Sequence, residues 1–429
     1  MARQRSDSEQ QLADLLTTAK ESLHLSVAFV SRMDGTTQHL EVVESSVPFL
    51  FSEGATQEQA TTFCQAIWDG KLPSVIPEVR KYPEAMKLPA SRLPRIRSYV
   101  SVPIVLSDGS RYGTFCAAGL TSDKALCKRD KALMDVLARA ASVIIEPGVR
   151  ERARRAEIVG RLGPLLAGRG PVVLLQPIVD LGTGTRVGAE ALSRFPPQWS
   201  KAPDVCFAEA HSVGVGDRLE LLALERAAEH LMVVPGYVSM NISPATLLTP
   251  ECADLFAAMP LPRVLLELSE HDPVTDYAEL TSTLAPLRDA GMRLAIDDVG
   301  AGFSSMRHIV LTAPDVIKLD RSIVAGVASD TVLRTLVRAL VDFAHGCDAR
   351  VVAEGVETAD DAATLLSLGV DDGQGWLFGR PAPASDLATA PAPPAEPGGP
   401  DLLAGFAAEV AANRADSGPD HDHFGREPC

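Results

Sequence analysis

The sequence of 429 residues contains no long apolar run. Its first ten residues are polar and contain no apolar signal-peptide core, and no apolar run approaches the roughly 18 residues that a membrane span needs. We therefore expect a cytoplasmic protein that does not bind membranes.

Cysteine is scarce and irregularly spaced. The seven cysteines are odd in number, dispersed, and never separated as C-x-x-C. Neither a disulfide framework nor a thiolate zinc site is therefore indicated, and a reducing compartment fits. Cys64 could hold a ligand covalently or sense oxidants, but a cysteine that follows Phe63 in an apolar context is more simply interpreted as packed core.

Positive charge is in short supply after residue 150. The whole chain has 40 Lys and Arg against 56 Asp and Glu, and residues 1–150 have 18 against 17, which leaves 22 against 39 for the rest. This acidic excess argues against binding to a nucleic-acid polymer, which requires clustered Lys and Arg. An anionic substrate would need metal cations to bind there.

What the chain does have is an ordinary globular composition, 46% hydrophobic and 22% charged, which predicts packed domains. Residues 8–148 predict an α+β domain: a helix at 8–24, two strand pairs that flank Asp34-Gly35 and Asp108-Gly109, and a helix at 131–145 that is expected to end at Pro147-Gly148. Residues 149–170 are expected to form a helical linker.

Residues 171–385 alternate short apolar runs with helical patterns, which predicts a modified, TIM-like (β/α)8 barrel. The first two runs, 172–181 and 187–195, are separated by too few residues for a crossover helix, so we expect one antiparallel strand. The eighth strand is placed around 376–378. Residues 386–429 are rich in Ala, Pro and Gly, which predicts a disordered tail.

Polar side chains recur near the carboxyl ends of these apolar runs, which share one mouth in a barrel. They are Glu190, Asn241, Glu267, Asp297, Asp298, Lys318, Asp320, Glu354, Glu357 and Gln374. Each acid could instead lie on the surface, but Glu190, Glu267 and Asp297 have apolar neighbours that would bury them. Clustered buried carboxylates repel one another unless cations lie among them, and oxygen ligands without Cys or His favour Mg²⁺ or Mn²⁺.

The pair Asp297 and Asp298 suits a two-metal site. One carboxylate can bridge two cations while the next holds the second cation, an arrangement that activates water for displacement at phosphorus. Lys318 would place a positive charge near a phosphate oxygen or the attacking water, although a lysine on the barrel rim is the alternative interpretation. These parts suit phosphodiester hydrolysis.

At this point the sequence resembles the EAL-domain phosphodiesterases, which open the bacterial second messenger cyclic di-GMP. The resemblance covers roughly residues 157–390. Its motifs are Gln176-Pro-Ile-Val-Asp-Leu, Gly188-Ala-Glu-Ala-Leu-Ser-Arg194, Asn241-Ile-Ser-Pro244, Glu267-Leu-Ser-Glu270, Asp297-Asp-Val-Gly-Ala-Gly-Phe-Ser-Ser305, Lys318-Leu-Asp320, Glu354-Gly-Val-Glu357 and Gln374-Gly-Trp-Leu-Phe-Gly-Arg-Pro381.

The resemblance implies a role for each matching residue and linear pGpG as the product. The implied metal ligands are Glu190, Asn241, Glu267, Asp297, Asp298 and Asp320. The implied catalytic residues are Lys318, which contacts the attacking water, Glu354, and Glu270, which holds the loop after Asp298. The implied substrate-binding residues are Gln176, Leu192, Arg194, Glu357 and Gln374. Val299 replaces the Phe usual in the family, which puts regulation through that loop in doubt.

The N-terminal domain resembles a GAF domain, on its helix-sheet-helix order and on short motifs around Cys64, Ile96–Ile104 and Tyr112–Cys116. GAF is a fold more than a function, so its ligand and the sign of its effect stay open. The resemblance predicts a homodimeric cyclic di-GMP phosphodiesterase regulated by GAF. The alternatives are an inactive effector that binds cyclic di-GMP and a scaffold for a partner protein.

Overall fold

The structure is a computed structural model that describes residues 5–47, 51–91, 96–269, 274, 276–300 and 305–389. It divides into two compact units, Met1–Ala156 and Glu157–Cys429. Glu270 and all of the predicted tail beyond residue 389 lie outside the described residues.

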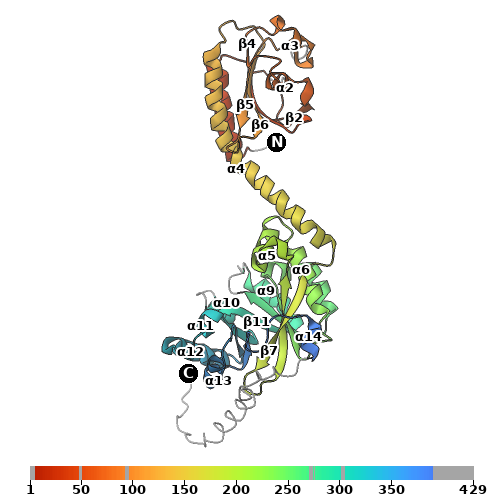
Figure 1. Ribbon diagram of the computed structural model, residues 1–429, viewed down its shortest axis with the longest axis vertical. Helices are drawn as coiled ribbons and strands as arrows, with labels where there is room; N and C mark the ends of the chain where they lie inside the picture. The colour runs from red at the N-terminus through yellow and green to blue at the C-terminus, as the bar shows by residue number, and fades with distance from the viewer. Residues whose placement is uncertain are drawn as a thin grey trace, which may run out of the picture. The chain divides into compact units, whose positions relative to one another are not determined.

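The first unit is built on a six-stranded antiparallel sheet of order β3-β2-β1-β6-β5-β4. Its strands are β1 (Val27–Met33), β2 (Thr37–Ser45), β3 (Thr56–Glu58), β4 (Val75–Ile76), β5 (Ser98–Val105) and β6 (Arg111–Gly119). Helix α1 (Asp7–Ser22) begins at a capping box between Ser6 and Glu9. Helices α1 and α4 (Lys128–Ala167) cover one face, and α2 (Phe63–Trp68) and α3 (Pro83–Lys87) lie on the other (Figure 1).

The prediction that the second helix of this unit ends at Pro147-Gly148 is wrong. Helix α4 runs without a break for 40 residues, through the predicted linker as far as Ala167. A proline removes one backbone donor and a glycine adds flexibility, but neither forbids a helix that side-chain contacts hold on both sides. Glu146 and Arg150 form an ion pair of 2.5 Å that spans the two breakers, and Glu146 also accepts hydrogen bonds from Ser107.

The second unit is a closed eight-stranded barrel of order β10-β11-β12-β13-β14-β7-β8-β9, so the (β/α)8 prediction is confirmed. Strand β7 alone runs antiparallel to both neighbours, β8 and β14, as expected from its short connection to β8. The strands are β7 (Val172–Asp180), β8 (Arg186–Arg194), β9 (Tyr237–Asn241), β10 (Val264–Ser269), β11 (Arg293–Val299), β12 (Val316–Leu319), β13 (Arg350–Ala353) and β14 (Asp372–Gln374).

Helices enclose the barrel strands, as α6, α9 and α12 illustrate in Figure 1. They are α5 (Pro203–Ser212), α6 (Gly216–Ala228), α7 (Pro244–Leu247), α8 (Pro250–Ala257), α9 (Tyr277–Asp289), α10 (Ser305–Thr312), α11 (Arg321–Val324), α12 (Thr331–Gly346), α13 (Ala359–Ser367) and α14 (Ala384–Thr389). A separate apolar layer inside the barrel, which includes Ile178, Leu265 and Val352, closes the end opposite the mouth.

The predicted position of the eighth strand, around 376–378, is wrong. Strand β14 is Asp372–Gln374, and Trp376 is half exposed beneath the guanidinium of Arg380. The aromatic residues suggested a strand at 376–378, but the strand contains Gly373 instead. A Cβ at this glycine would lie 2.8 Å from both Leu181 and Phe378, so these side chains pack directly against the strand backbone. A hydropathy pattern does not show that side chains pack this closely against a glycine, so it could not locate this strand.

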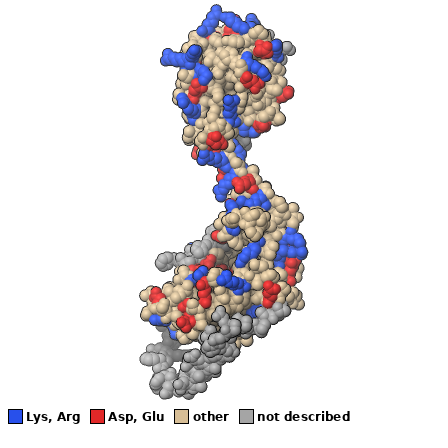
Figure 2. All heavy atoms as spheres, viewed as in Figure 1, with Lys and Arg blue, Asp and Glu red and all other residues tan. Residues whose placement is uncertain are grey.

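Both signs of charge are mixed over the face of the molecule seen in Figure 2, without one large basic surface. Among the described residues no helix is long and apolar enough to cross a membrane.

Candidate active site

The predicted acids and lysine meet at the carboxyl ends of the parallel strands. Glu190 lies in β8, Glu267 in β10, Asp297 in β11 and Lys318 in β12, and Glu354 directly follows β13. Because the barrel is closed, side chains that are up to 164 residues apart in the sequence meet at the mouth of the barrel. Strand register fixes their neighbours, since Glu267 pairs with Asn241 of β9 on one side.

The ammonium group of Lys318 lies at the centre of this cluster. Its Nζ is 2.6 Å from Glu354 Oε1, 2.8 Å from Glu267 Oε1, 3.1 Å from Asp297 Oδ1 and 3.7 Å from Glu190 Oε2. Lys318 and Glu267 are both 0% exposed. One buried positive charge therefore faces four carboxylates, a balance that favours further cations.

The carboxylates form two groups that share Asp297. Oxygens of Glu190, Glu267 and Asp297 lie within 4.8 Å of one another, and so do oxygens of Asp297, Asp298 and Glu354. Each group has the oxygen donors and the size for one divalent cation. A shared carboxylate is what a two-metal site requires.

An irregularity in β11 brings Asp297 and Asp298 to the same side. Consecutive residues of a regular strand point to opposite faces, so only one of the two would reach the mouth. The pairing of β11 with β12 shifts register between Ile296 and Val299, and Asp298 has a left-handed backbone with φ of 59°. Such bulges redirect side chains at active sites at a cost in backbone energy.

Two amide groups orient Glu190. Asn241 Nδ2 donates to Glu190 Oε1 at 3.0 Å, and Gln374 Nε2 donates to Glu190 Oε2 at 2.6 Å. Gln374 Nε2 also lies 3.2 Å from Gln176 Oε1, whose own amide donates to the carbonyl of Gly379. This chain of hydrogen bonds ties the strand before Glu190 and the last strand of the barrel to one carboxylate, as supporting partners do for metal ligands.

Burial and charge shift the acids in different directions. Burial raises the pKa of Glu267 well above its usual range, and burial together with neighbouring carboxylates raises the pKa of Glu354 to about 8, against the opposing charge of Lys318. Burial acts the same way on Glu190, but Lys318 and the two amides outweigh it and lower its pKa. The carboxylates raise the pKa of Lys318 despite its burial. The lysine therefore stays charged, while Glu267 and Glu354 tend toward the protonated form.

The carboxylate oxygens at the centre of the acid cluster are suited to bind a metal ion. Within the described residues, Glu267 Oε2 is buried without a hydrogen-bond donor. A buried carboxylate oxygen without a donor costs free energy, which a divalent cation would recover. Glu190, Glu267 and Asp297 would hold one such ion, and Asp297, Asp298 and Glu354 a second.

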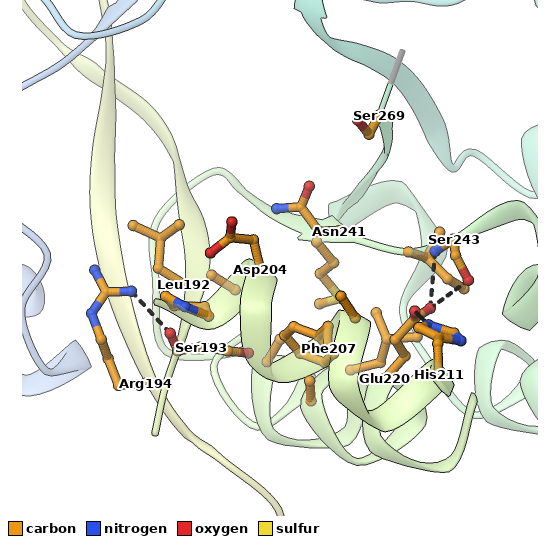
Figure 3. A pocket seen from close by; sticks show the side chains of 18 residues that line it. Leu192, Ser193, Arg194, Asp204, Phe207, His211, Glu220, Asn241, Ser243 and Ser269 are labelled. Atoms are coloured by element: carbon orange, nitrogen blue, oxygen red, sulfur yellow. Dashed lines mark hydrogen bonds and ion pairs between the residues drawn. The ribbon is translucent and has the colours of Figure 1, made fainter. Parts of the chain in front are cut away.

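A pocket of about 460 Å³ adjoins the acid cluster. Figure 3 shows Leu192 and Arg194 on the β8 side, Asp204 and Phe207 on helix α5, and Asn241 to the right of Asp204 and above Phe207. The guanidinium of Arg194 donates to the carbonyl of Ser193 at 2.9 Å, which holds its charge beside the pocket. Its lining is apolar with a few polar groups, as in pockets that bind small organic molecules.

Two predicted site residues, Asp320 and Glu357, lie outside the cluster, and the placement of a third is not described. Asp320 caps helix α11, where its Oδ1 accepts from the backbone nitrogen of Ser322 at 2.8 Å. Glu357 pairs with Arg321 at 2.9 Å on the surface. Glu270 lies outside the described residues.

The sequence prediction missed Ser239, whose hydroxyl donates to Glu267 Oε1. Ser239 is 0% exposed and lies two residues before Asn241 in β9. Residues two apart in a strand share a face, so the predicted position of Asn241 at the mouth already implied that Ser239 points into the barrel. Ser239 could therefore have been predicted from the sequence as a polar residue inside the barrel.

Comparisons with known proteins identify the family of each domain. The EAL domain model matches residues 164–381, and the GAF domain model matches residues 7–145. An uncharacterised protein of Azorhizobium caulinodans is 32% identical over 50% of this chain and 32% of its own. The probable cyclic di-GMP phosphodiesterase PdeB of Escherichia coli is 29% identical over 53% of this chain and 46% of its own. The chain thus spans less than half the length of these relatives.

The solved structure of the EAL enzyme Bd1971, in its form bound to cAMP and cyclic di-GMP, has a TM-score of 0.51 and 20% identity, and the match covers 85% of this chain and 92% of that one. At this identity the likeness concerns the fold alone. The family model, by contrast, matches half of the chain and includes every acid of the cluster. This chain therefore belongs to the EAL family and carries a GAF domain before its EAL domain.

Proposed function

We propose that the chain is a metal-dependent phosphodiesterase that hydrolyses cyclic di-GMP to linear pGpG, and that its GAF domain regulates it. The observation that carries the proposal is the pair of three-carboxylate groups that share Asp297 around Lys318. Relatives that match about half of this chain are named as cyclic di-GMP phosphodiesterases, among them PdeF of Escherichia coli, which is 27% identical over 55% of this chain. In this proposal the enzyme works in the cytoplasm as a homodimer with Mg²⁺ or Mn²⁺.

In this proposal the site residues have different roles in hydrolysis. Divalent cations held by the two carboxylate groups would supply Lewis-acid stabilisation of the phosphate charge and lower the pKa of a water molecule. Lys318 orients that water, because its ammonium is a fixed donor among acceptors. Arg194 neutralises the charge of a substrate phosphate, and Leu192 packs against a substrate base in the adjoining pocket. Glu354 is placed to accept the water proton or to hold the second cation.

Hydrolysis is tested directly with the purified full chain. Cyclic di-GMP is incubated with Mg²⁺ or Mn²⁺, and a parallel sample contains a chelator. We expect pGpG by chromatography only in the sample with metal. Tight nucleotide binding with no product at any metal concentration would contradict the proposal and would favour an effector that only binds the nucleotide.

Metal binding should strengthen as the pH rises toward 8. With a pKa of about 8 in the metal-free protein, Glu354 holds a proton at neutral pH, and a cation must displace it. The affinity therefore falls as the pH drops below this value, by up to about tenfold per pH unit for one proton released. The increase in melting temperature caused by Mn²⁺ should thus be larger at about pH 8.5 than at about pH 6.5. An equal or reversed effect would show that no such proton is displaced.

A further inference from the structure

The GAF domain contains two cysteines in contact, on the face of its sheet away from α1 and α4. Cys64 lies in α2 and Cys116 in β6, and their sulfur atoms are 3.4 Å apart. Both side chains are buried, at 1% and 0% exposure. The two residues are 52 positions apart in the sequence, so only the fold places them together.

Their surroundings are polar for a core position. Gln38 Nε2 lies 3.0 Å from the sulfur of Cys64, and the Tyr99 hydroxyl lies 3.0 Å from the same sulfur. Ser101 and Thr114 each contact the sulfur of Cys116 at 3.2 Å. A cysteine that serves only as apolar core needs no such partners, whereas donors around a sulfur stabilise its thiolate.

The two thiols are not equivalent. Burial opposes ionisation of Cys64, but hydrogen bonds from Cys116, Thr114, Tyr99 and Gln38 outweigh it and lower its pKa to about 6. Burial and the neighbouring thiol raise the pKa of Cys116 well above its ordinary value. One sulfur is thus prepared to act as the nucleophile and the other stays protonated until the first has reacted.

A cavity lies beside the first of these cysteines. Cys64 lines a space of about 320 Å³ together with Gln38, Phe63 and Tyr99. Gln57, also in its lining, is exposed, so the cavity reaches the surface. A peroxide is little larger than a water molecule, which needs about 30 Å³. Cys116 does not line this cavity, so an oxidant meets Cys64 first.

We propose that Cys64 and Cys116 form a reversible disulfide when the protein meets a hydroperoxide, with Cys64 as the attacking residue and Cys116 as the resolving one. The Cys64 thiolate attacks a peroxide oxygen, the O–O bond breaks, and the departing oxygen takes up the proton that the thiol released on ionisation, which gives a sulfenic acid and, from hydrogen peroxide, one water. The Cys116 sulfur then attacks the Cys64 sulfur, the S–O bond breaks, and the hydroxyl leaves with the Cys116 proton as a second water. The two thiols are oxidised by two electrons and the peroxide is reduced.

The geometry requires only a small movement. A disulfide bond is about 2.05 Å long, so the sulfurs must approach by roughly 1.3 Å. Helix α2 has six residues and can shift more easily than the central strand β6. The bond would remove the sulfur contacts with Gln38 and Tyr99, which both line the cavity, and would therefore change the shape of the GAF pocket.

The test treats the reduced full chain with hydrogen peroxide, blocks the remaining thiols by alkylation, and maps peptides by mass spectrometry. We expect the loss of two of the seven thiols, one peptide pair joined through Cys64 and Cys116, and full reversal by dithiothreitol. Cys252, buried in the barrel, is the internal control for unfolding, and it should stay unreacted until the chain is denatured.

Two variants assign the order of reaction. In Cys116→Ser the peroxide should leave a sulfenic acid on Cys64 that dimedone traps, and in Cys64→Ser it should leave Cys116 free. Oxidation confined to the exposed Cys127 and Cys347 would overturn the proposal. So would a Cys64–Cys116 link that appears only together with reaction of Cys252, because the link would then come from unfolded protein.

Discussion

Glu267→Gln is expected to lower the turnover of cyclic di-GMP by more than about 100-fold. Supporting partners of metal ligands already account for about 10–100-fold in affinity or activity, and Glu267 is proposed as a ligand itself. The amide keeps the shape of the side chain but loses its negative charge and one acceptor. Steady-state kinetics with saturating Mn²⁺ measure the loss.

The same variant should keep its stability without metal. The pKa of Glu267 is raised well above its usual value in the metal-free protein, so the side chain already tends toward the neutral form that Gln imitates. The metal-free melting temperature should therefore change little, while the increase on adding Mn²⁺ should disappear. Glu225→Gln, an exposed change on α6, is the matched control. Retention of the metal-dependent increase in Glu267→Gln would show that Glu267 does not hold the ion.

Lys318→Met is expected to remove turnover and also to destabilise the barrel by about 3–5 kcal/mol near pH 8 without metal. The methionine fits the space of the lysine stem, but four carboxylates then face one another without a counter-charge. Unfolding in urea, followed by circular dichroism, measures the free-energy difference.

The pH dependence separates charge repulsion from a packing defect. Without Lys318 the folded-state pKa values of Glu267 and Glu354, which are already raised, rise further above their unfolded values. Stability from such groups is present below the unfolded pKa and is lost as the pH rises through the folded one. The deficit of Lys318→Met should therefore shrink at about pH 5 and grow toward about pH 8. Lys87→Met, at an exposed ion pair, should show no measurable change, and a pH-independent deficit in Lys318→Met would indicate lost packing instead.

The sequence predicted that the acids gather at the mouth of the barrel, but not the backbone geometry that directs each of them there. Apolar runs that end in acids indicate a barrel mouth, because parallel strands share an edge, and this placed Glu190, Glu267 and Asp297 together. The bulge at Asp297 and Asp298 was not predictable, since register shifts depend on the neighbouring strand. The uninterrupted course of α4 through Pro147 depends on contacts such as Glu146 with Ser107, which a local pattern does not contain.

The contact between Cys64 and Cys116 shows the same limit. Cys64 has an apolar local context and was therefore interpreted as core, which is correct for its burial. The proximity of the two cysteines follows from the pairing of β5 with β6 and the position of α2 over that sheet. A hydropathy pattern records which face a residue occupies, but not which residue it meets there.

The closure of the barrel has a consequence for synthesis of the chain. Strand β7, the first of the barrel, hydrogen-bonds to β14, the last, and Gln374 contacts Gln176 across 198 residues. A chain emerging from the ribosome cannot complete this ring, or orient Glu190 through Gln374, until nearly all of the domain has been made. Nascent barrels must therefore remain with open strand edges, and the hydrogen bond from Gln374 to Glu190 forms only once translation has passed β14.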